Sequence, residues 1–391
     1  MKANKKLMAL LMAAGILTTS VCPMNAFAAG PLADKVGSGY DEATWARLTD
    51  DVLEYDEVPM LVHEFNTTVT QIWDTLYDAQ EDLKGIVEEL ESSQFKMERL
   101  TDKATSEGDF AGIMQYMTQD IILGYTIPVM RSASSSILSR STMGTLQKAE
   151  NQFTMIIQSL MITYDSTVKQ RDMVEQLQKM YDRQYQLILN KQAQGLATMQ
   201  EVIAAQANQL SALSTLQTID SGLMQMKPTL CSLSGWPADA NPTIAEIPTV
   251  DLSKIDEMNL EEDTRKAIGN NSELISQRSS EAGKTSAGVD ARLAVLDEGD
   301  QKMTIKMQSL YDDVFAKKSA YEGAKAGFEA AQKQADSYAR MYEVGFLSEA
   351  DYLGTQIAYY QKKAAYVSAD TALRLAIETY GWAVKGLVNA D

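Results

Sequence analysis

The chain has 391 residues, and its 35 Lys or Arg against 53 Asp or Glu give a formal net charge of −18 at pH 7. This acidic balance argues against nucleic acid as a partner, because phosphate binding needs a basic surface. With one histidine and two cysteines in all, the sequence also lacks the ligand sets of the usual zinc sites.

The first residues have the form of a secretory signal peptide. Three lysines at positions 2, 5 and 6 precede an apolar stretch over residues 7–21, and Ala26-Phe27-Ala28 supplies small residues at a peptidase site. We expect cleavage after Ala28, with a membrane anchor as the alternative. A lipoprotein signal at Cys22 fits less well, because Val21 before it is too bulky.

The rest of the chain shows no run of about 20 apolar residues of the kind that a transmembrane helix needs. Removing the three lysines of the signal peptide leaves 32 basic and 53 acidic residues, a net charge of −21. The sequence therefore predicts an exported protein of the cell envelope. We expect the protein in the outer membrane if the host is diderm. If the host is monoderm, we expect it to be wall-associated or extracellular.

The sequence has few residues of the kinds that usually carry out catalysis. His63 is the only histidine, and it lies in an amphipathic stretch, Met60–Phe65, that favours a packed or solvated ring. A Ser-His-Asp triad would need it, yet no strand-turn-helix serine motif accompanies it, and no glycine-rich phosphate loop is present. We predict no enzyme, and no catalytic, cofactor-binding or metal-binding residues. Cys231 is the single cysteine after the signal peptide, so no intrachain disulfide is expected.

Proline placement indicates the organisation of the chain. Four prolines lie between Pro228 and Pro248, whereas none occurs over residues 129–227 or 249–391. Because proline breaks helix interiors, its absence permits long helices and its clustering marks a linker. The predicted division is a signal peptide (1–28), a first helical half (29–227), a proline-containing linker (228–252) and a second helical half (253–391).

The second half has the clearer helical pattern. A heptad seam predicts two long antiparallel helices joined by a tight turn near Gly345. A preceding helix is expected over Glu262–Leu296, ending in a turn at Asp297–Asp300. The seam positions are Leu310, Val314, Tyr321, Ala324, Phe328, Ala331, Ala335, Tyr338 and Tyr342 before the turn, and Leu353, Ile357, Tyr360, Ala364 and Val367 after it.

The first half is similar. Apolar spacing predicts one helix over Val69–Leu90, a second from Leu146 to about Asn190 and a third from Thr198 to about Met226. The stretch Ser106–Ser141, rich in Ser, Gly and Met, has no clear pattern. The two halves align with a shift of 150 residues, which places Gly195 on Gly345, and each half carries a Gly-Trp pair, at Gly235-Trp236 and at Gly381-Trp382. This shared order suggests a duplication.

These turns resemble those of a known family. "YEVGFLSEADYLGTQIAYYQKKAAYVSADTALRLAIETYGWAVKGL" (Tyr342–Leu387) is similar to the C-terminal helical hairpin of TolC-like outer membrane efflux proteins, and "QGLATMQEVIAAQANQ" (Gln194–Gln209) to the matching turn of the first half. "NNSELISQR" (Asn270–Arg278) resembles the Asn-Pro-x-Leu opening of a family repeat with Ser272 in place of proline. "EVPMLVHEF" (Glu57–Phe65) is a weaker version in the first half. The resemblance covers roughly residues 48–387.

The resemblance implies a homotrimer whose helices form a tapered α-barrel, closed in the membrane by strands inserted in each half. It also implies passage of substrates driven by an ABC or similar pump, through a membrane-fusion adaptor that docks at the glycine turns. Here the strand position of the second half holds only Asp297–Asp300, and Ile121–Met130 could supply one short strand at most, against the 9–11 residues that a membrane strand needs. We therefore expect an all-α, TolC-like α-barrel without a membrane β-barrel.

The resemblance assigns the candidate site residues. Two acids seven residues apart, Glu329 and Asp336, could face a channel entrance, although a solvated face explains them as well. The turn residues could dock an adaptor or could simply cap their own helices. These turn residues are Gln194, Gly195, Leu196, Ala197 and Thr198 in the first half and Val344, Gly345, Phe346, Leu347 and Ser348 in the second.

Two kinds of function remain open. The first is an export or efflux conduit component with an adaptor and a pump as partners. The second is a secreted helical-bundle protein that binds an envelope partner and conducts nothing, and an ordinary antiparallel bundle explains the heptad seam as well as an α-barrel does. Trimerisation distinguishes the two, because a conduit has to close a ring.

Overall fold

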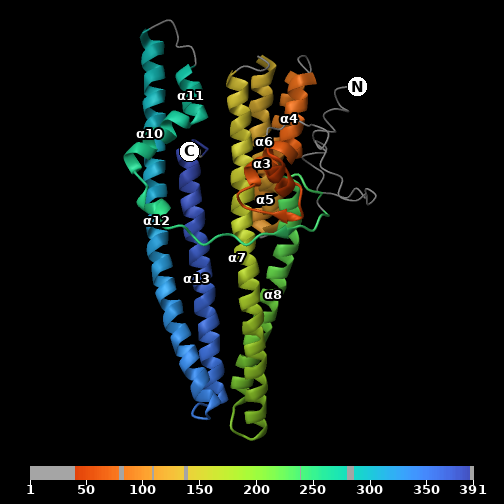
Figure 1. Ribbon diagram of the computed structural model, residues 1–391, viewed down its shortest axis with the longest axis vertical. Helices are drawn as coiled ribbons and strands as arrows, with labels where there is room; N and C mark the ends of the chain where they lie inside the picture. The colour runs from red at the N-terminus through yellow and green to blue at the C-terminus, as the bar shows by residue number, and fades with distance from the viewer. Residues whose placement is uncertain are drawn as a thin grey trace. The chain divides into compact units, whose positions relative to one another are not determined.

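The computed structural model describes residues 40–78, 83–107, 110–135, 140–237, 239–279 and 286–387, so the expected signal peptide lies outside the described residues. The described elements appear in Figure 1. In chain order they are α2 (Glu42–Leu48), β1 (Val52–Leu53), α3 (Val58–Phe65), α4 (Thr67–Asp78), α5 (Leu83–Glu107), α6 (Phe110–Ser135), α7 (Arg140–Ala193), α8 (Met199–Leu233), β2 (Thr243–Ile244), α9 (Ser253–Asp256), α10 (Leu260–Asn270), α11 (Ser272–Ser279), α12 (Ser286–Glu343) and α13 (Glu349–Val384).

The fold is almost entirely helical, which confirms the predicted fold class of long paired helices. The strands of the described residues are two residues each and pair in parallel, Val52 with Thr243 and Leu53 with Ile244. The segment Ile121–Met130, which the sequence allows as one short strand, lies inside α6. Leu123, Ile127 and Met130 are buried from one face of α6 in a core shared with α4, α5 and α7, and this helical spacing explains the difference.

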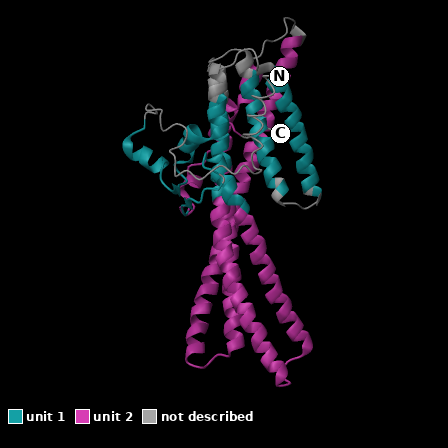
Figure 2. Ribbon diagram, turned by 90° about the vertical axis from the view of Figure 1, so that its right-hand side faces the viewer, with its two compact units in different colours: residues 1–161, 225–246 teal, residues 162–224, 247–391 magenta. Residues whose placement is uncertain are grey.

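The chain divides into two compact units (Figure 2). Unit 1 comprises residues 1–161 and 225–246, and unit 2 comprises residues 162–224 and 247–391. In unit 1, α5 and α6 form a helical pair, and the buried residues of this unit include Ile72, Leu90 and Phe153. In unit 2, α10 packs on the pair formed by α12 and α13.

Unit 2 contains two helical hairpins. The first is made of the later part of α7 and the earlier part of α8, where Arg171 Nε lies 2.6 Å from an Asp220 oxygen and the Gln209 amide donates to Asp182 at 2.7 Å. The second, α12 with α13, uses the predicted heptad seam: Val314, Tyr321, Ala335, Leu353 and Ile357 are buried. In Figures 1 and 2 the turns of both hairpins lie at the same end of unit 2.

The expected turn at Asp297–Asp300 is wrong, because α12 runs through it without interruption. The packing of α11 explains why. Gly299 lies so close to Leu274 of α11 that a side chain there would overlap it, and Arg278 pairs with Asp300 at 2.8 Å. Glycine thus serves as a contact point inside a helix of 58 residues, about 87 Å long at 1.5 Å per residue. The expected helix Glu262–Leu296 is accordingly α10, α11 and the start of α12.

Two helix boundaries in the first half also differ from expectation. α8 continues through Pro228 to Leu233, five residues beyond the start of the expected linker. Pro228 has no backbone N–H, so the helix lacks the hydrogen bond to the carbonyl of Met224. The side chain of Met224 is exposed. The residues expected as one helix over Val69–Leu90 lie in α4 and α5.

The joint between α3 and α4 is built like the joint between α10 and α11. Asn66 Oδ1 accepts from the backbone N–H groups of Thr68 and Val69, and Asn271 Oδ1 accepts from those of Glu273 and Leu274. Each asparagine therefore caps the second helix of its joint. Asn66-Thr67-Thr68-Val69 has the same geometry as Asn271-Ser272-Glu273-Leu274. It directly follows the weaker sequence match, Glu57–Phe65, and is not part of it.

The helices α8 and α13 return to these joints and end in matching glycines. Gly235, two residues after α8, has φ 89° and lies against Phe65, and Gly386, two residues after α13, has φ 79° and lies against Asn270. The expected equivalence of the Gly-Trp pairs is therefore wrong. Gly381 is inside α13, and the counterpart of Gly235 is Gly386, because the left-handed backbone at the helix end is what requires glycine.

Candidate functional site

The two turns of unit 2 share one backbone construction. Gly195 ends α7 with φ 73°, and Gly345 ends α12 with φ 79°. In the first turn the Leu196 N–H donates to the Lys191 carbonyl at 2.8 Å, and in the second the Phe346 N–H donates to the Met341 carbonyl at 2.8 Å. This is the Schellman arrangement, in which a left-handed glycine lets the chain reverse and satisfies the last carbonyls of the helix.

Both turns also begin the returning helix in the same way. The Thr198 hydroxyl accepts from the Glu201 N–H at 3.3 Å while the Glu201 carboxylate accepts from the Thr198 N–H at 2.6 Å. The Ser348 hydroxyl accepts from the Asp351 N–H at 3.2 Å and donates to the Asp351 carboxylate at 2.6 Å. Hydrogen bonds from Thr198 lower the pKa of Glu201. Each tip is thus a glycine, an apolar residue, a spacer and a capping Thr or Ser, and the first tip has the reciprocal bond of a full capping box.

The apolar residue after each glycine is exposed. Leu196 is 72% exposed and Phe346 is 81% exposed. At the other end of the second hairpin, Leu387 follows Gly386 in the same Schellman position and is only 5% exposed. In this motif the residue after the glycine commonly packs back on its own helix, as Leu387 does. At the tips Leu196 and Phe346 do not pack back in this way.

The remaining expected tip residues surround these two side chains. Gln194, Thr198, Val344 and Ser348 are exposed, whereas Ala197 and Leu347, which occupy the spacer position in each tip, are half-buried. Val344 adds a further apolar side chain at 66% exposure. The expected tip residues therefore lie together at two short turns, as the glycine spacing predicts.

Polar contacts connect the two hairpins of unit 2 near their tips. Arg183 on α7 pairs with Glu349 at the start of α13, and farther from the tips the Gln361 amide donates to the Tyr181 hydroxyl at 3.3 Å. Gln170 and Ser368 approach to 3.4 Å farther up. These contacts hold the two tips side by side, so Leu196 and Phe346 belong to one end of one unit (Figure 1).

Glu329 and Asp336 are both exposed on α12. Tyr359 of α13 lies close to Asp336, and its pKa is raised by burial first, with Tyr360 and Asp336 adding to the effect. Exposure of these two acids fits a solvated face and a channel lining equally.

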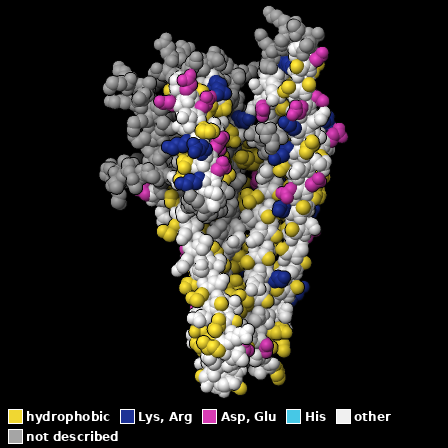
Figure 3. All heavy atoms as spheres, turned by 180° about the vertical axis from the view of Figure 1, so that it is seen from behind, with side chains coloured by type: hydrophobic (Ala, Val, Ile, Leu, Met, Phe, Trp, Pro, Cys, Tyr) yellow, Lys and Arg dark blue, Asp and Glu magenta, His cyan; other side chains and the backbone are white. Residues whose placement is uncertain are grey.

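Sequence reasoning missed a second surface, the outer face of α8. Between Met199 and Met226 this helix has no Lys or Arg, and its two acids, Glu201 and Asp220, are engaged by Thr198 and Arg171. The absence of basic residues over 28 positions is the signal that could have found it. The exposed apolar side chains are Met199, Ile203, Leu210, Leu213 and Met224, between 41% and 77% exposed. Figure 3 shows yellow and white side chains with few charges at the lower left, where α7 and α8 run.

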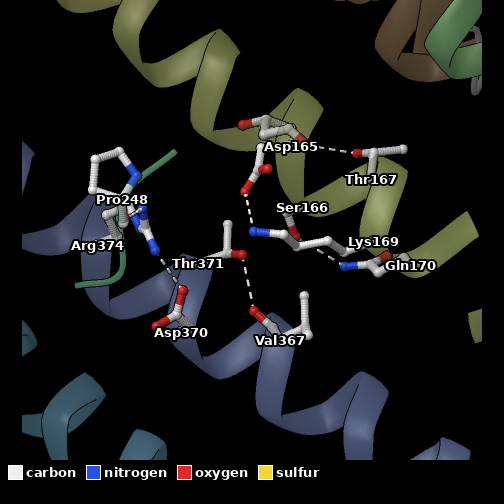
Figure 4. Close-up of polar contacts among 11 residues, drawn as sticks. Asp165, Ser166, Thr167, Lys169, Gln170, Pro248, Val367, Asp370, Thr371 and Arg374 are labelled. Atoms are coloured by element: carbon white, nitrogen blue, oxygen red, sulfur yellow. Dashed lines mark hydrogen bonds and ion pairs between the residues drawn. The ribbon is translucent and has the colours of Figure 1, made fainter. Parts of the chain in front are cut away.

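The linker is anchored to α13 by a buried arginine that sequence reasoning also missed. Arg374 is 9% exposed, pairs with Asp370 one turn earlier at 2.8 Å and donates to the Pro248 carbonyl. Figure 4 shows Arg374 pointing from α13 to the linker, on the side of α13 that faces α7 in this unit. Burial of the charge is tolerated here because the guanidinium has both a carboxylate and a backbone carbonyl as acceptors.

None of the helices in the described part of the chain combines the length and the apolar character that crossing a membrane requires. The sequence matches no protein-family model and no curated protein.

Comparison with solved structures finds outer membrane channels of the TolC family at low sequence identity. CusC matches with 12% identity and a TM-score of 0.49 over 83% of this chain and 99% of that chain. VceC from Vibrio cholerae matches with 12% identity and a TM-score of 0.44 over 89% and 99%. The open state of MtrE from Neisseria gonorrhoeae matches with 12% identity and a TM-score of 0.41 over 85% and 89%. The chain is thus similar in structure to these outer membrane channels.

Proposed function

We propose that this chain is a non-catalytic export or efflux conduit component of the cell envelope, which docks through its two hairpin tips to an adaptor protein of a pump. The observation that carries the proposal is the pair of exposed apolar side chains, Leu196 and Phe346, at two glycine turns with the same backbone arrangement in one unit. The resemblance of both turns to those of TolC-like proteins supports it.

The physical case for docking rests on the cost of the exposure. A leucine and a phenylalanine in water forgo a burial worth about 1.5–3 kcal/mol each. The same backbone motif buries its apolar residue at Leu387, so the fold has a way to cover such a residue and does not use it at the tips. A partner with an apolar surface that spans both tips would cover both side chains at once.

The proposed assembly is a homotrimer, and the neutral face of α8 is its self-association surface. Charged residues are depleted at the core of protein interfaces, and the exposed side of α8 carries apolar, small and amide side chains instead. The exposed sides of α12 and α7, in contrast, carry residues such as Lys317, Glu322 and Arg183. In a closed ring, Glu329 and Asp336 would face the channel.

The tip proposal is tested by the double variant Leu196→Glu with Phe346→Glu. The measurement is binding of the purified mature chain to the purified adaptor encoded nearest to its gene, by biolayer interferometry. We expect binding to be lost while the melting temperature stays within about 2 °C, because neither side chain is part of a buried seam.

The matched control is Leu293→Glu with Ile305→Glu, two exposed apolar positions on α12 that lie far from the tip in sequence. This control adds the same charge and should bind normally. Normal binding by the tip variant, or unfolding of it, would show that the docking assignment is wrong.

The self-association proposal is tested separately by sedimentation velocity at micromolar concentration. The wild type should sediment as a trimer, and Ile203→Glu with Leu210→Glu should sediment as a monomer with unchanged circular dichroism. A monomeric wild type would favour the alternative function, a secreted helical-bundle protein that binds an envelope partner without conducting.

A further inference from the structure

The short helix α3 of unit 1 is apolar in the middle and titratable at both ends. Val58, Leu61 and Val62 have no exposed surface, and Phe65 is 7% exposed. Glu57 lies at the N-terminal cap and His63 lies in the last turn. The helix thus carries a titratable side chain near each end of a buried apolar segment.

Glu57 is a buried carboxyl group with one acceptor unused. It is 1% exposed, and Oε1 accepts from the Glu54 N–H at 2.8 Å. Oε2 is buried without a hydrogen-bond partner among the described residues. The charged groups that face it are Glu54, Asp50 and Arg47, and Arg47 is already paired with Glu54. A proton on Glu57 removes a buried charge that this surrounding does not compensate.

His63 connects α3 to α7. Its Nδ1 lies 3.0 Å from Glu150 Oε1 on α7, and its Nε2 lies 3.9 Å from Glu64 Oε1 on α3. Tyr40, whose pKa is raised by burial and by Glu64 and Glu150, is the other titratable group at this end. The imidazolium faces two carboxylates of low exposure, so the charged form of His63 is the one that this cluster stabilises.

We propose that α3 is a proton-dependent latch of unit 1, which is held in place when Glu57 carries a proton and His63 is an imidazolium, and which loosens when both lose their protons. The two groups act in the same direction, because loss of a proton from either Glu57 or His63 lowers the net charge around α3 by one. This inference does not depend on the proposed function.

The pH range follows from the two groups. Burial raises the pKa of Glu57 from 4.5 to about 7, and the hydrogen bond to Glu150 raises the pKa of His63 above 6.5. Since both pKa values are higher in the folded state, both stabilising contributions are present at low pH and decline as the pH rises. The contribution of Glu57 declines between pH 4.5 and about 7, and that of His63 declines above pH 6.5.

The latch also has a mechanical connection within unit 1. Phe65, the last residue of α3, lies against Gly235, and Asn66 donates from its amide to the Leu233 carbonyl at the end of α8. Loosening of α3 therefore releases a support of the C-terminal end of α8. An exported chain, as the N-terminal sequence predicts, would meet the external pH directly.

The test is amide hydrogen exchange of the purified mature chain at pH 6 and pH 8, with mass spectrometry of the peptide over residues 58–66. Protection factors are compared after correction for the higher intrinsic exchange rate at pH 8. We expect protection in this peptide to fall at least about tenfold from pH 6 to pH 8. This is the change that the rise of the Glu57 pKa from 4.5 to about 7 implies. A peptide from the core of α12, residues 310–321, should not change.

Three variants assign the effect. Glu57→Gln should exceed the wild type in protection at both pH values, and its advantage should be about tenfold larger at pH 8 than at pH 6. His63→Gln should lower protection at pH 6, and the double variant should show no pH dependence. The control Glu42→Gln, an exposed carboxyl group of the same unit, should behave as the wild type.

A measurement on the wild type keeps the test independent of whether these variants fold. His63 is the only histidine, so selective ¹³C labelling gives one histidine signal in a tag-free chain. Its titration should give a pKa above 6.5 that falls toward 6.5 in Glu150→Gln. Equal protection at pH 6 and pH 8 in the wild type, a pH dependence that survives in the double variant, or a His63 pKa at or below 6.5 would overturn the proposal.

Discussion

Gly235 and Gly386 end α8 and α13 in the same way. Each has a positive φ and lies against the residue that precedes a capping asparagine, Phe65 before Asn66 and Asn270 before Asn271. The amide of Asn66 donates to the Leu233 carbonyl, and the amide of Asn270 donates to the Val384 carbonyl at 3.0 Å. The glycine, the residue it touches and the capping asparagine therefore recur in each half of the sequence, which supports the proposed duplication. The donor to the helix end differs, because it is the capping asparagine in one joint and the residue before it in the other.

We expect Gly235→Ala and Gly386→Ala each to destabilise the chain by about 2–5 kcal/mol. A methyl group costs about 1–2 kcal/mol at a left-handed position and about 1–3 kcal/mol where it overlaps backbone atoms. Urea unfolding followed by circular dichroism measures the change. Gly354→Ala, inside α13 with open space around it, is the control and should stabilise by about 0.5–1 kcal/mol. Equal effects at all three positions would contradict the account of the joint.

The capping asparagines give a second prediction. Asn66→Ala removes an acceptor for two backbone N–H groups and the donor to Leu233, so we expect a loss of about 2–3 kcal/mol in the free energy of unfolding. Asn66→Ser keeps a side-chain oxygen for the cap and loses the donor to Leu233 without burying a charge. Its loss should be smaller, and the order Asn, Ser, Ala in stability is the result that chemical denaturation would check. A serine variant as unstable as alanine would mean that the cap contributes little.

The buried arginine of unit 2 should hold the linker in place. Arg374→Met leaves Asp370 half-covered without its cation and leaves the Pro248 carbonyl without its donor, so we expect a loss of about 3–5 kcal/mol. Limited proteolysis with mass spectrometry should show faster cleavage within residues 245–252. Lys254→Met, which breaks an exposed pair with Glu378, is the control and should cost at most about 1 kcal/mol. Unchanged cleavage in Arg374→Met would show that the linker is held by other contacts.

The charge state of Glu57 gives a stability prediction with a definite sign. Because burial raises its pKa to about 7, the wild type carries the buried charge at pH 8 but not at pH 5. Glu57→Gln should therefore raise the melting temperature at pH 8, by about 2–4 °C for each kcal/mol that the charge costs, and leave it nearly unchanged at pH 5. Differential scanning fluorimetry at both values checks this. A higher melting temperature at pH 5 alone would reverse the sign and refute the assignment.

The sequence alone was sufficient for the features that depend on local pattern. A sustained heptad repeat buries one stripe of a helix, so the spacing of Val314, Tyr321 and Leu353 is enough to assign them to the seam of α12 and α13. The turns at Gly195 and Gly345 follow from glycine between long helical patterns, because a left-handed residue is needed to reverse the chain there. Docking at these turns stays a prediction.

Features that depend on contacts between distant segments needed the tertiary structure. Asp297–Asp300 has the composition of a turn, but in the structure it lies inside α12 and packs against Leu274 and Arg278. The equivalence of Gly235 with Gly386 could not be seen from the neighbouring tryptophans, because it depends on what each glycine touches.

The same distinction applies to charge. Glu57 follows several acids in the sequence, and Arg374 lies in a helix, and charged residues in such places are ordinarily solvated. The tertiary structure buries them, Glu57 at the cap of α3 and Arg374 under the linker. Periodicity determines which face of a helix is apolar, because that depends on residues three and four apart. Which polar residue loses its water depends on which segment covers it, and this only the packing of the whole chain decides.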